Sequence, residues 1–292
     1  YREALLALSK QVVEELEQLR TARTMEPYIG PAILAPEATG VLFHEAVGHR
    51  LEGERQHNEE EGQTFKGQVG QEVVPTFLSV VDDPTQETHE NIQLNGFYRF
   101  DDEGTPAARA VLIENGILRG FLLSRKPVSE GDQSNGHGRA QGTEMPIARM
   151  GNLIVTADPS KSHTDAELKA MLIEELKRQQ KPFGLYIKDI TGGSTNTSGY
   201  GYQAFKGSPR LVYRIDATTG AETLVRGVEI VGTPLTAISK IVAAGQSSAI
   251  FNGFCGAESG YVAVSTVAPA VLLTEIELQR VQGLKERSTI LS

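Results

Sequence analysis

Cysteine is nearly absent from this 292-residue sequence, in which Cys255 is the only one. A single cysteine cannot form an intrachain disulfide, so the fold must depend on core packing, to which a bound metal could add. Basic residues are also scarce: 28 Lys and Arg stand against 37 Asp and Glu, for a net charge of −9. This deficit disfavours a general nucleic-acid or anionic-membrane binder.

Long apolar runs and a signal peptide are missing as well. No run approaches the roughly 20 apolar residues that a membrane span needs. The first residues form a charged amphipathic segment, without the basic start and apolar core of a secretory signal. We therefore expect a soluble, cytoplasmic protein. The hydrophobic content of 39% is enough to bury the core of one large domain or two small ones.

Apolar periodicity predicts four helices. Leu5, Leu8 and Val12 begin a repeat of three or four positions, which predicts an amphipathic lead-in helix over residues 1–24. Proline and glycine interrupt residues 27–36, and a second helix is expected to start at residue 37 and to carry the run that ends in His44 and Glu45. Further helices are expected over residues 233–244 and from a cap at Ser162 or Thr164 to residue 179.

The remaining runs predict strands. Strands are expected at residues 76–81, 153–156 and 184–190, and two apolar runs within 109–124 meet at Asn115-Gly116, a favoured hairpin turn. A second hairpin is expected over residues 210–230, and Pro269 separates two further runs, 261–267 and 270–278. Hairpin-linked strands with a few helices predict an α+β fold with largely antiparallel β-sheets.

The segment HEAVGH carries the best motif, because it places His44, Glu45 and His49 within six residues. Imidazole and carboxylate groups are typical of a hydrolytic metal site. On an ideal helix, however, residues five apart lie about 140° from one another around the axis, too far to share an ion. We therefore predict that the helix is widened, as in a π-bulge, or unwound between Ala46 and His49.

A catalytic metal usually has three protein ligands and one open position, and Cys255 is the natural third ligand. Its thiolate suits zinc, although iron and cobalt are also chemically plausible. Glu45 is then the candidate general base, which takes a proton from metal-activated water and delivers it to the leaving amine. Two plainer interpretations stay open, because a chance His pair is common and a lone cysteine is often a small buried hydrophobe.

The stretch GVLFHEAVGHRLEG resembles the His-Glu-x-x-x-His signature of the TldD/PmbA family, formerly called modulators of DNA gyrase. FLSVVDDPT, GFLLSR, ARMGNLIV, GGSTNTSGYGY and NGFCGAESG also resemble that family, in the same order. The resemblance covers nearly all of residues 1–292 and corresponds to the family's C-terminal, catalytic portion. The family's N-terminal domain is therefore expected to be absent.

This resemblance implies a metallopeptidase that hydrolyses peptide bonds of short or unfolded peptides. His44, His49 and Cys255 would hold one divalent ion, Zn²⁺ in the first place and Fe²⁺ or Co²⁺ as alternatives, with Glu45 as the catalytic carboxylate. The family also contains PmbA/TldE-like members that lack the motif and serve as partners of the active subunit. We expect the chain to form either a homodimer or a heterodimer with such a subunit.

Two rival functions follow from the same resemblance. The first is a non-catalytic, peptide-binding partner subunit, which the members without the motif make credible. The second is a regulator of DNA topology, suggested by the old family name. The acidic charge and the lack of a basic stripe count against the second, so we expect neither nucleic acid nor membrane as a partner.

Candidate substrate contacts are less specific. Gly192, Gly193, Gly199 and Gly201 give a composition that is typical of a flexible turn. In the resembling family, such glycine-rich segments are associated with holding an extended peptide by its backbone. His137 lies among polar residues, where a solvated position is the ordinary expectation, but it could also line the substrate path, and Arg139 beside it could meet a peptide carboxylate.

Overall fold

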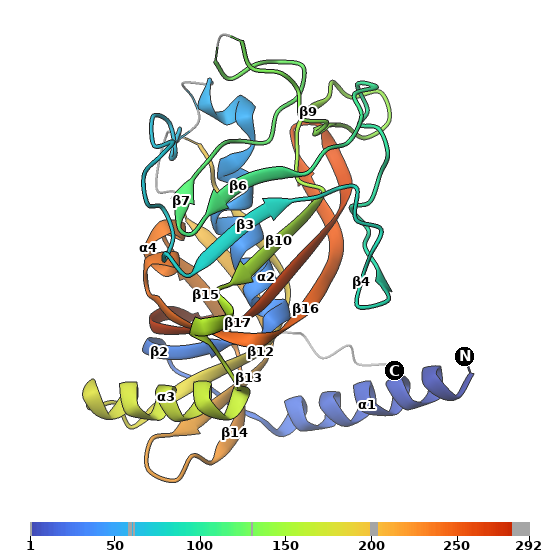
Figure 1. Cartoon of the computed structure of the whole chain (residues 1–292). Helices are drawn as coiled ribbons and strands as arrows, with labels where there is room; N and C mark the ends of the chain where they lie inside the picture. Colours follow the sequence, from blue (N-terminus) through green and yellow to red (C-terminus); the bar gives the residue numbers. More distant parts are fainter. Residues whose placement is uncertain (1, 58–59, 61, 130, 199–203, 282–292) are drawn as a thin grey trace.

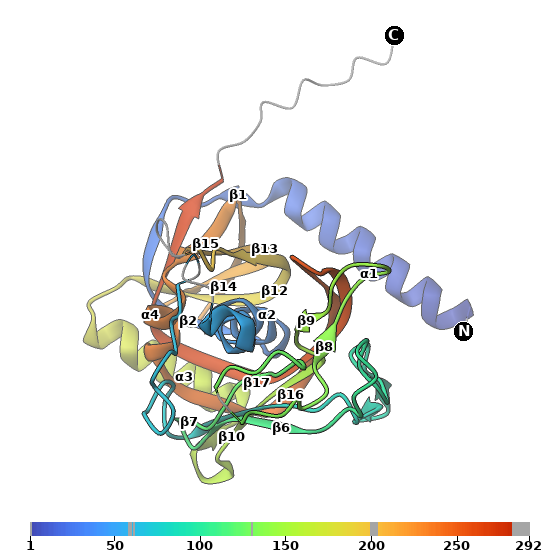
Figure 2. The same cartoon turned by 90° about the horizontal axis from the view of Figure 1, so that it is seen from above.

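A buried helix, α2 (Pro36–Ala46), occupies the centre of the fold. The computed structural model describes residues 2–57, 60, 62–129, 131–198 and 204–281. Every residue of α2 from Ala38 to Ala46 is buried. A helix that is apolar nearly all round is typical of a protein interior, and Figure 2 shows α2 at the centre with strands on all sides of it.

One curved sheet of thirteen described strands surrounds α2. Its main path runs in the order β1-β14-β13-β12-β2-β17-β10-β3-β6-β7, and β11, β15 and β16 pair off this path. The strands are β1 (Arg23–Thr24), β2 (Tyr28–Leu34), β3 (Leu78–Asp82), β6 (Ala110–Glu114), β7 (Ile117–Leu118), β10 (Asn152–Ala157), β11 (Ser162–His163), β12 (Phe183–Thr195), β13 (Phe205–Asp216), β14 (Glu222–Arg226), β15 (Val228–Gly232), β16 (Ile241–Ala257) and β17 (Gly260–Arg280).

Most of the pairings are antiparallel, as predicted. The described parallel pairs are β1–β14, β2–β12, β10–β17 and β11–β16. Two small antiparallel pairs complete the strands: β4 (Thr88–His89) with β5 (Ile92–Gln93), and β8 (Gly138–Arg139) with β9 (Ile147–Ala148). The predicted α+β class with largely antiparallel sheet is therefore confirmed.

Apart from α2, the described helices and 3₁₀ turns connect or flank the strands of this sheet. α3 (Asp165–Arg178) packs on its outer side, and Leu168, Leu172 and Leu176 form its buried face. α4 (Pro234–Ser239) is short, and the 3₁₀ turns are η1 (Gly48–Leu51), η2 (Gly53–Gln56) and η3 (Pro159–Lys161). None of the helices described in the structure is long and apolar enough to cross a membrane.

The predicted lead-in helix is present as α1 (Arg2–Thr21), which projects from the body (Figures 1 and 2). Its apolar residues do not join the core, since Leu5, Leu8 and Val12 are 60%, 59% and 57% exposed. Arg210 of β13 forms an ion pair with Glu15 and links the helix to the sheet.

Two predictions near proline and glycine were wrong. Residues 27–36 contain β2, a strand in the middle of the sheet, and Pro31 is tolerated because it lies opposite a register shift between Leu273 and Ile276 of β17. β17 likewise continues through Pro269, whose partner Ser248 borders a register shift in β16. In both places the proline lies at or beside an irregularity of the ladder, where its missing N–H is tolerated best.

The predicted helix over residues 233–244 was also too long. α4 ends at Ser239, and β16 starts at Ile241. The β-branched pair Ile241 and Val242 favours a strand, and pairing with β17 outweighs the local helical pattern. The consequence for the site is direct, because β16 is the strand that carries Cys255.

Candidate metal centre

The HEAVGH motif lies where α2 ends. The α-helix stops at Ala46, Val47 has φ −117° and ψ −52°, and the 3₁₀ turn η1 begins at Gly48. The predicted break between Ala46 and His49 is therefore confirmed in its unwound form. No π-helical turn occurs in the described part of the chain, so the backbone tightens here instead of widening.

Gly48 is required by close packing at this break. A Cβ atom on Gly48 would lie 2.1 Å from Sδ of Met150, which is itself buried. A larger residue would push η1 away from the connection between β9 and β10. The unwound turn therefore depends on glycine for space.

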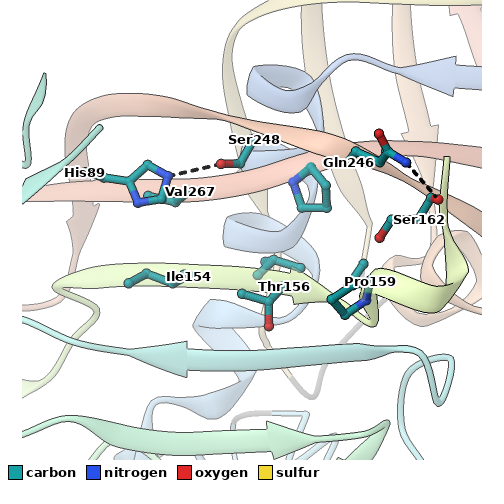
Figure 3. A pocket seen from close by; sticks show the side chains of 12 residues that line it. His89, Ile154, Thr156, Pro159, Ser162, Gln246, Ser248 and Val267 are labelled. Carbon is teal, nitrogen blue, oxygen red and sulfur yellow. Dashed lines mark hydrogen bonds between the residues drawn. The ribbon is translucent and has the colours of Figure 1, made fainter. Parts of the chain in front are cut away.

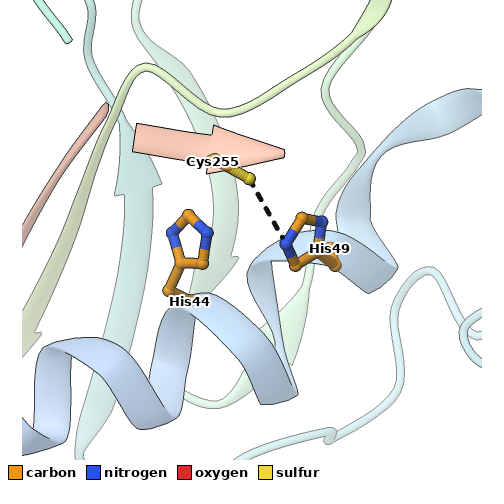
Figure 4. Close-up of side chains that lie close together, drawn as sticks. All are labelled: His44, His49 and Cys255. Carbon is orange, nitrogen blue, oxygen red and sulfur yellow. Dashed lines mark hydrogen bonds between the residues drawn. The ribbon is translucent and has the colours of Figure 1, made fainter. Parts of the chain in front are cut away.

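His44, His49 and Cys255 meet in one buried cluster (Figure 4). One ligand atom from each lies within 4.8 Å of the others, and no other such group of three was found in the described residues. His49 Nε2 lies 3.4 Å from Cys255 Sγ, and the rings of His44 and His49 are 5.0 Å apart and nearly perpendicular. Cys255 reaches the cluster from β16, near the tip of the β16–β17 hairpin.

These side chains fit a divalent metal. Ligand atoms bound to one tetrahedral zinc ion are about 3.3–3.6 Å apart, as the usual Zn–N and Zn–S distances require. The observed spacing needs only small side-chain adjustments to reach that geometry. In addition, Nδ1 of His44 is buried without a hydrogen-bond partner. Two imidazoles and one thiolate form a donor set that suits zinc.

The charges of the cluster favour a thiolate. Burial by itself would raise the pKa of Cys255, but the charges of His44 and His49 outweigh it and lower this pKa to about 5. Burial would likewise lower the pKa of His49, whereas the carboxylate of Glu52 and the Cys255 thiolate raise it to about 10. A metal ion would replace the proton that the thiolate and the imidazole hold between them.

Glu45 lies beside the cluster, with Oε2 3.9 Å from His49 Nε2. Burial raises the pKa of Glu45 above its ordinary value, although the charges of His44 and His49 oppose this effect. A carboxyl group with a raised pKa suits proton exchange near neutral pH. The backbone of Gly193 packs against this side chain, since a Cβ atom there would lie 2.7 Å from Glu45 Cγ.

The structure adds buried charged residues that the sequence analysis did not single out. Glu52 accepts hydrogen bonds from His49 Nδ1 and Arg55 Nε, at 3.1 Å and 2.8 Å. Arg50 donates to the carbonyl oxygen of Glu45 at the end of α2 (2.8 Å), where a cation also complements the helix dipole. The only available sequence signal was the run of charges in GHRLEGER directly after the motif.

A pocket of about 350 Å³ opens onto the cluster. On one side it is lined by the end of β12 and the residues after it, including Gly193, Thr195 and Thr197, and on the other by β16 from Phe254 to Ala257. Of the predicted glycines, Gly193 therefore lines the pocket and Gly192 does not. Gly199 and Gly201 lie outside the described residues.

His137 and Arg139 are placed away from this pocket, and both are buried. His137 is fully buried and not solvated; its Nε2 lies 3.2 Å from Oδ1 of Asp82. Arg139 donates to the carbonyl oxygens of Met150 and Ala263, at 2.6 Å and 2.8 Å. In this structure both side chains therefore make internal contacts that hold the β8–β9 segment against the sheet.

A second cavity, of about 320 Å³, lies beside β10 and β16 (Figure 3). His89 Nε2 and Ser248 Oγ share a hydrogen bond of 3.0 Å at its edge. Ile154, Val267 and Pro269 contribute apolar surface. This cavity offers a single imidazole and no thiolate, so its lining residues do not form a second metal centre.

Comparison with known proteins identifies relatives of this chain. The sequence profile of the PmbA/TldA metallopeptidase C-terminal domain matches residues 28–280. A metalloprotease from Archaeoglobus fulgidus is 31% identical over 263 residues, which cover 90% of this chain and 56% of that protein. A zinc metalloprotease TldD homolog from Saccharolobus solfataricus is 26% identical over 278 residues, covering 94% and 56%. The chain therefore spans about half the length of these relatives.

Among solved structures, TldE from Thermococcus kodakarensis is similar. The TM-score is 0.66 at 17% sequence identity, and the match covers 92% of this chain and 54% of that chain. At this level of identity the similarity concerns the fold alone.

Proposed function

The chain belongs to the PmbA/TldA metallopeptidase family, and we propose that it is a catalytic member, which hydrolyses peptide bonds with the help of one divalent metal ion. The observation that carries the proposal is the meeting of three ligand atoms within 4.8 Å, beside the carboxylate of Glu45. His44, His49 and Cys255 would hold the ion. The name of the Saccharolobus solfataricus relative supports zinc.

A bound ion would supply Lewis acidity, which lowers the pKa of water and polarises a peptide carbonyl. Glu45 would act as general base and then general acid: its carboxylate takes a proton from the attacking water and returns that proton to the leaving amine. The buried position of Glu45 supports this role, because a raised pKa makes the return of the proton easier.

The substrate that fits best is an extended peptide, short or unfolded. At the pocket, β12 pairs with β13 on one side, and β16 pairs with β17 on one side. Among the described strands, none pairs with the opposite edge of residues 193–195 or of residues 253–257. A peptide could therefore add its backbone to either edge, which would give affinity with little sequence preference.

The oligomer is part of the proposal. The family resemblance implies a two-subunit complex, either with a TldE-like partner or with a second copy of this chain. Light scattering of the chain alone and mixed with such a partner distinguishes these two assemblies.

The proposal is tested by elemental analysis together with a cleavage assay on unfolded casein and short peptides. We expect about one metal ion per wild-type chain and its loss in His49→Ala and Cys255→Ala. Glu45→Gln should keep the metal and lose turnover by about 10²-fold or more, because general acid–base catalysis contributes that much. Glu37→Gln, on the exposed start of the same helix, is the control and should behave as wild type.

Two results would contradict the proposal. A wild-type chain that stays metal-free after incubation with zinc, iron and cobalt would remove the metallopeptidase assignment. Peptide binding without cleavage, equal in wild type and Glu45→Gln, would instead support the non-catalytic partner subunit.

A further inference from the structure

Glu52 is a buried carboxylate that contacts one of the proposed metal ligands. Its side chain is 1% exposed, and Oε2 lies 3.1 Å from His49 Nδ1. The other ring nitrogen, Nε2, is the one that faces Cys255. A carboxylate that accepts a hydrogen bond from one imidazole nitrogen fixes the proton there and leaves the lone pair of the other nitrogen for a metal.

Arg149 holds the opposite side of the cluster. It is the largest fully buried side chain in the described chain, and its Nη2 donates to the carbonyl oxygen of Cys255 (2.7 Å). Its Nη1 donates to Ser259 Oγ and to the carbonyl oxygen of Gly260, at 2.9 Å and 3.0 Å. One guanidinium group therefore fixes both the backbone of Cys255 and the turn that joins β16 to β17.

Glu52 and Arg149 also contact each other. Arg149 Nε lies 3.3 Å from Glu52 Oε1, with both side chains almost completely buried. The contacts thus form a chain from the His49 ring through Glu52 and Arg149 to the Cys255 backbone. His49 and Cys255 are 206 residues apart in the sequence, so this buried pair is a direct link between the two ligand segments.

We propose that Glu52 and Arg149 are positioning residues of the metal centre: Glu52 sets the tautomer and orientation of His49, and Arg149 holds Cys255 within reach of the same ion. The inference rests on the proposed function, since it concerns the same centre. Neither side chain lines the pocket over the cluster, so both act through the ligands and not on the substrate.

The test measures metal affinity and ligand geometry on purified protein. Zinc affinity is determined by competition with a chromophoric chelator at one fixed pH, and the visible spectrum of the Co²⁺ form reports the thiolate and imidazole ligands. Glu52→Gln should bind zinc about 10- to 100-fold more weakly. Arg149→Lys keeps the charge but cannot reach both Glu52 and the Cys255 carbonyl, so it should also bind more weakly and shift the cobalt spectrum.

Asp82→Asn is the matched control, because Asp82 and His137 form another fully buried carboxylate–histidine pair, in which Asp82 contacts His137 and the backbone N–H of Gly151 in place of a proposed metal ligand. It should alter the free energy of unfolding while zinc affinity stays within about two-fold of wild type. Wild-type affinity and an unchanged cobalt spectrum in Glu52→Gln would overturn the inference. Equal weakening in Asp82→Asn would also overturn it, because the effect would then reflect a general loss of packing.

Two further outcomes are separable. If Glu52→Gln does not unfold cooperatively, Arg149→Lys decides by the same two measurements. If the wild-type chain takes up no metal, both the proposed function and this inference are wrong. If the wild type binds zinc and both variants bind it with the same affinity, only the positioning role is wrong.

Discussion

Gly193 leaves no space for a side chain beside Glu45. A Cβ atom at this position would lie 2.7 Å from Glu45 Cγ and 3.0 Å from Oε1. Any residue other than glycine would therefore displace the carboxylate that we propose as general base. A Cβ atom at the neighbouring Gly192 would have no heavy atom within 4 Å. Substituting each glycine in turn therefore distinguishes an effect of losing glycine in the backbone from an effect of displacing Glu45.

Gly193→Ala should lower kcat for peptide cleavage by about 10²-fold, since a displacement of about 1 Å can cost that much. Metal content should stay at the wild-type value, because the atoms nearest to a Cβ at Gly193 all belong to Glu45 and not to a proposed ligand. Gly192→Ala should keep wild-type kcat within about two-fold. Equal activity in both variants would show that Glu45 does not need its present position. The measurement is steady-state cleavage of a fluorogenic peptide with metal analysis of the same samples.

The site residues were predictable to different degrees. His44, Glu45 and His49 lie within one short motif, so residue chemistry and helix geometry were enough to bring them together and to place the break after Ala46. Cys255 was inferred from its chemistry, because nothing local links it to the motif. Glu52 and Arg149 were missed because sequence alone does not indicate which charged residues are buried, and both pack against segments far along the chain.

At the scale of elements, regular helices, tight turns and several strands, among them those at residues 76–81, 153–156 and 184–190, could be predicted, whereas β2 and β16 could not. The turn at Asn115-Gly116 was expected, and both residues have positive φ, 49° and 80°. The proline in β2 and the glycines in β16 weaken their local strand signal. Both strands form because neighbouring strands supply hydrogen bonds and burial, which a local pattern does not contain.

The start of α3 offers a test of one such local prediction. Of the two expected caps, Thr164 is the one observed: its hydroxyl accepts from the backbone N–H of Glu167, whose carboxylate accepts from Thr164 in return. Thr164→Ala should therefore lower the free energy of unfolding by about 1 kcal/mol. Ser162→Ala should have a smaller effect, and neither variant should change metal content. A larger loss for Ser162→Ala in chemical denaturation would contradict the assignment.

The same cap has a pH dependence with a defined sign. Hydrogen bonds from Thr164 lower the pKa of Glu167 below its ordinary value of 4.5. A carboxylate with a lowered folded pKa stabilises the fold above its unfolded pKa, and this contribution is lost as the pH falls through the folded value. The difference in Tm between wild type and Glu167→Gln should therefore be present at neutral pH and shrink in acid.

At the scale of the whole molecule, the centre joins parts of the chain that are far apart in sequence. His44 belongs to α2, the helix that the sheet surrounds (Figure 2), and His49 to the 3₁₀ turn η1 just after it, whereas Cys255 belongs to β16 of the β16–β17 hairpin. The order of the strands in the sheet could not be predicted from the sequence, because it depends on which segments pair. Helix α2 and strand β16, which carries Cys255, are separated by most of the chain. Metal binding should consequently require the folded chain and should stabilise it.

A ligand that binds only the folded state stabilises it by RT ln(1 + [L]/Kd), or about 4 kcal/mol at a concentration 1,000-fold above Kd. Added zinc should therefore raise the Tm of the metal-free wild type by several degrees. Glu45→Gln should show the same rise, because Glu45 is not a proposed ligand, whereas His49→Ala and Cys255→Ala should not. Mg²⁺ should have no comparable effect, since it prefers oxygen ligands. If Cys255→Ala kept the full rise in differential scanning fluorimetry, the ion would be held by α2 and η1 alone, and the bridging role of β16 would be wrong.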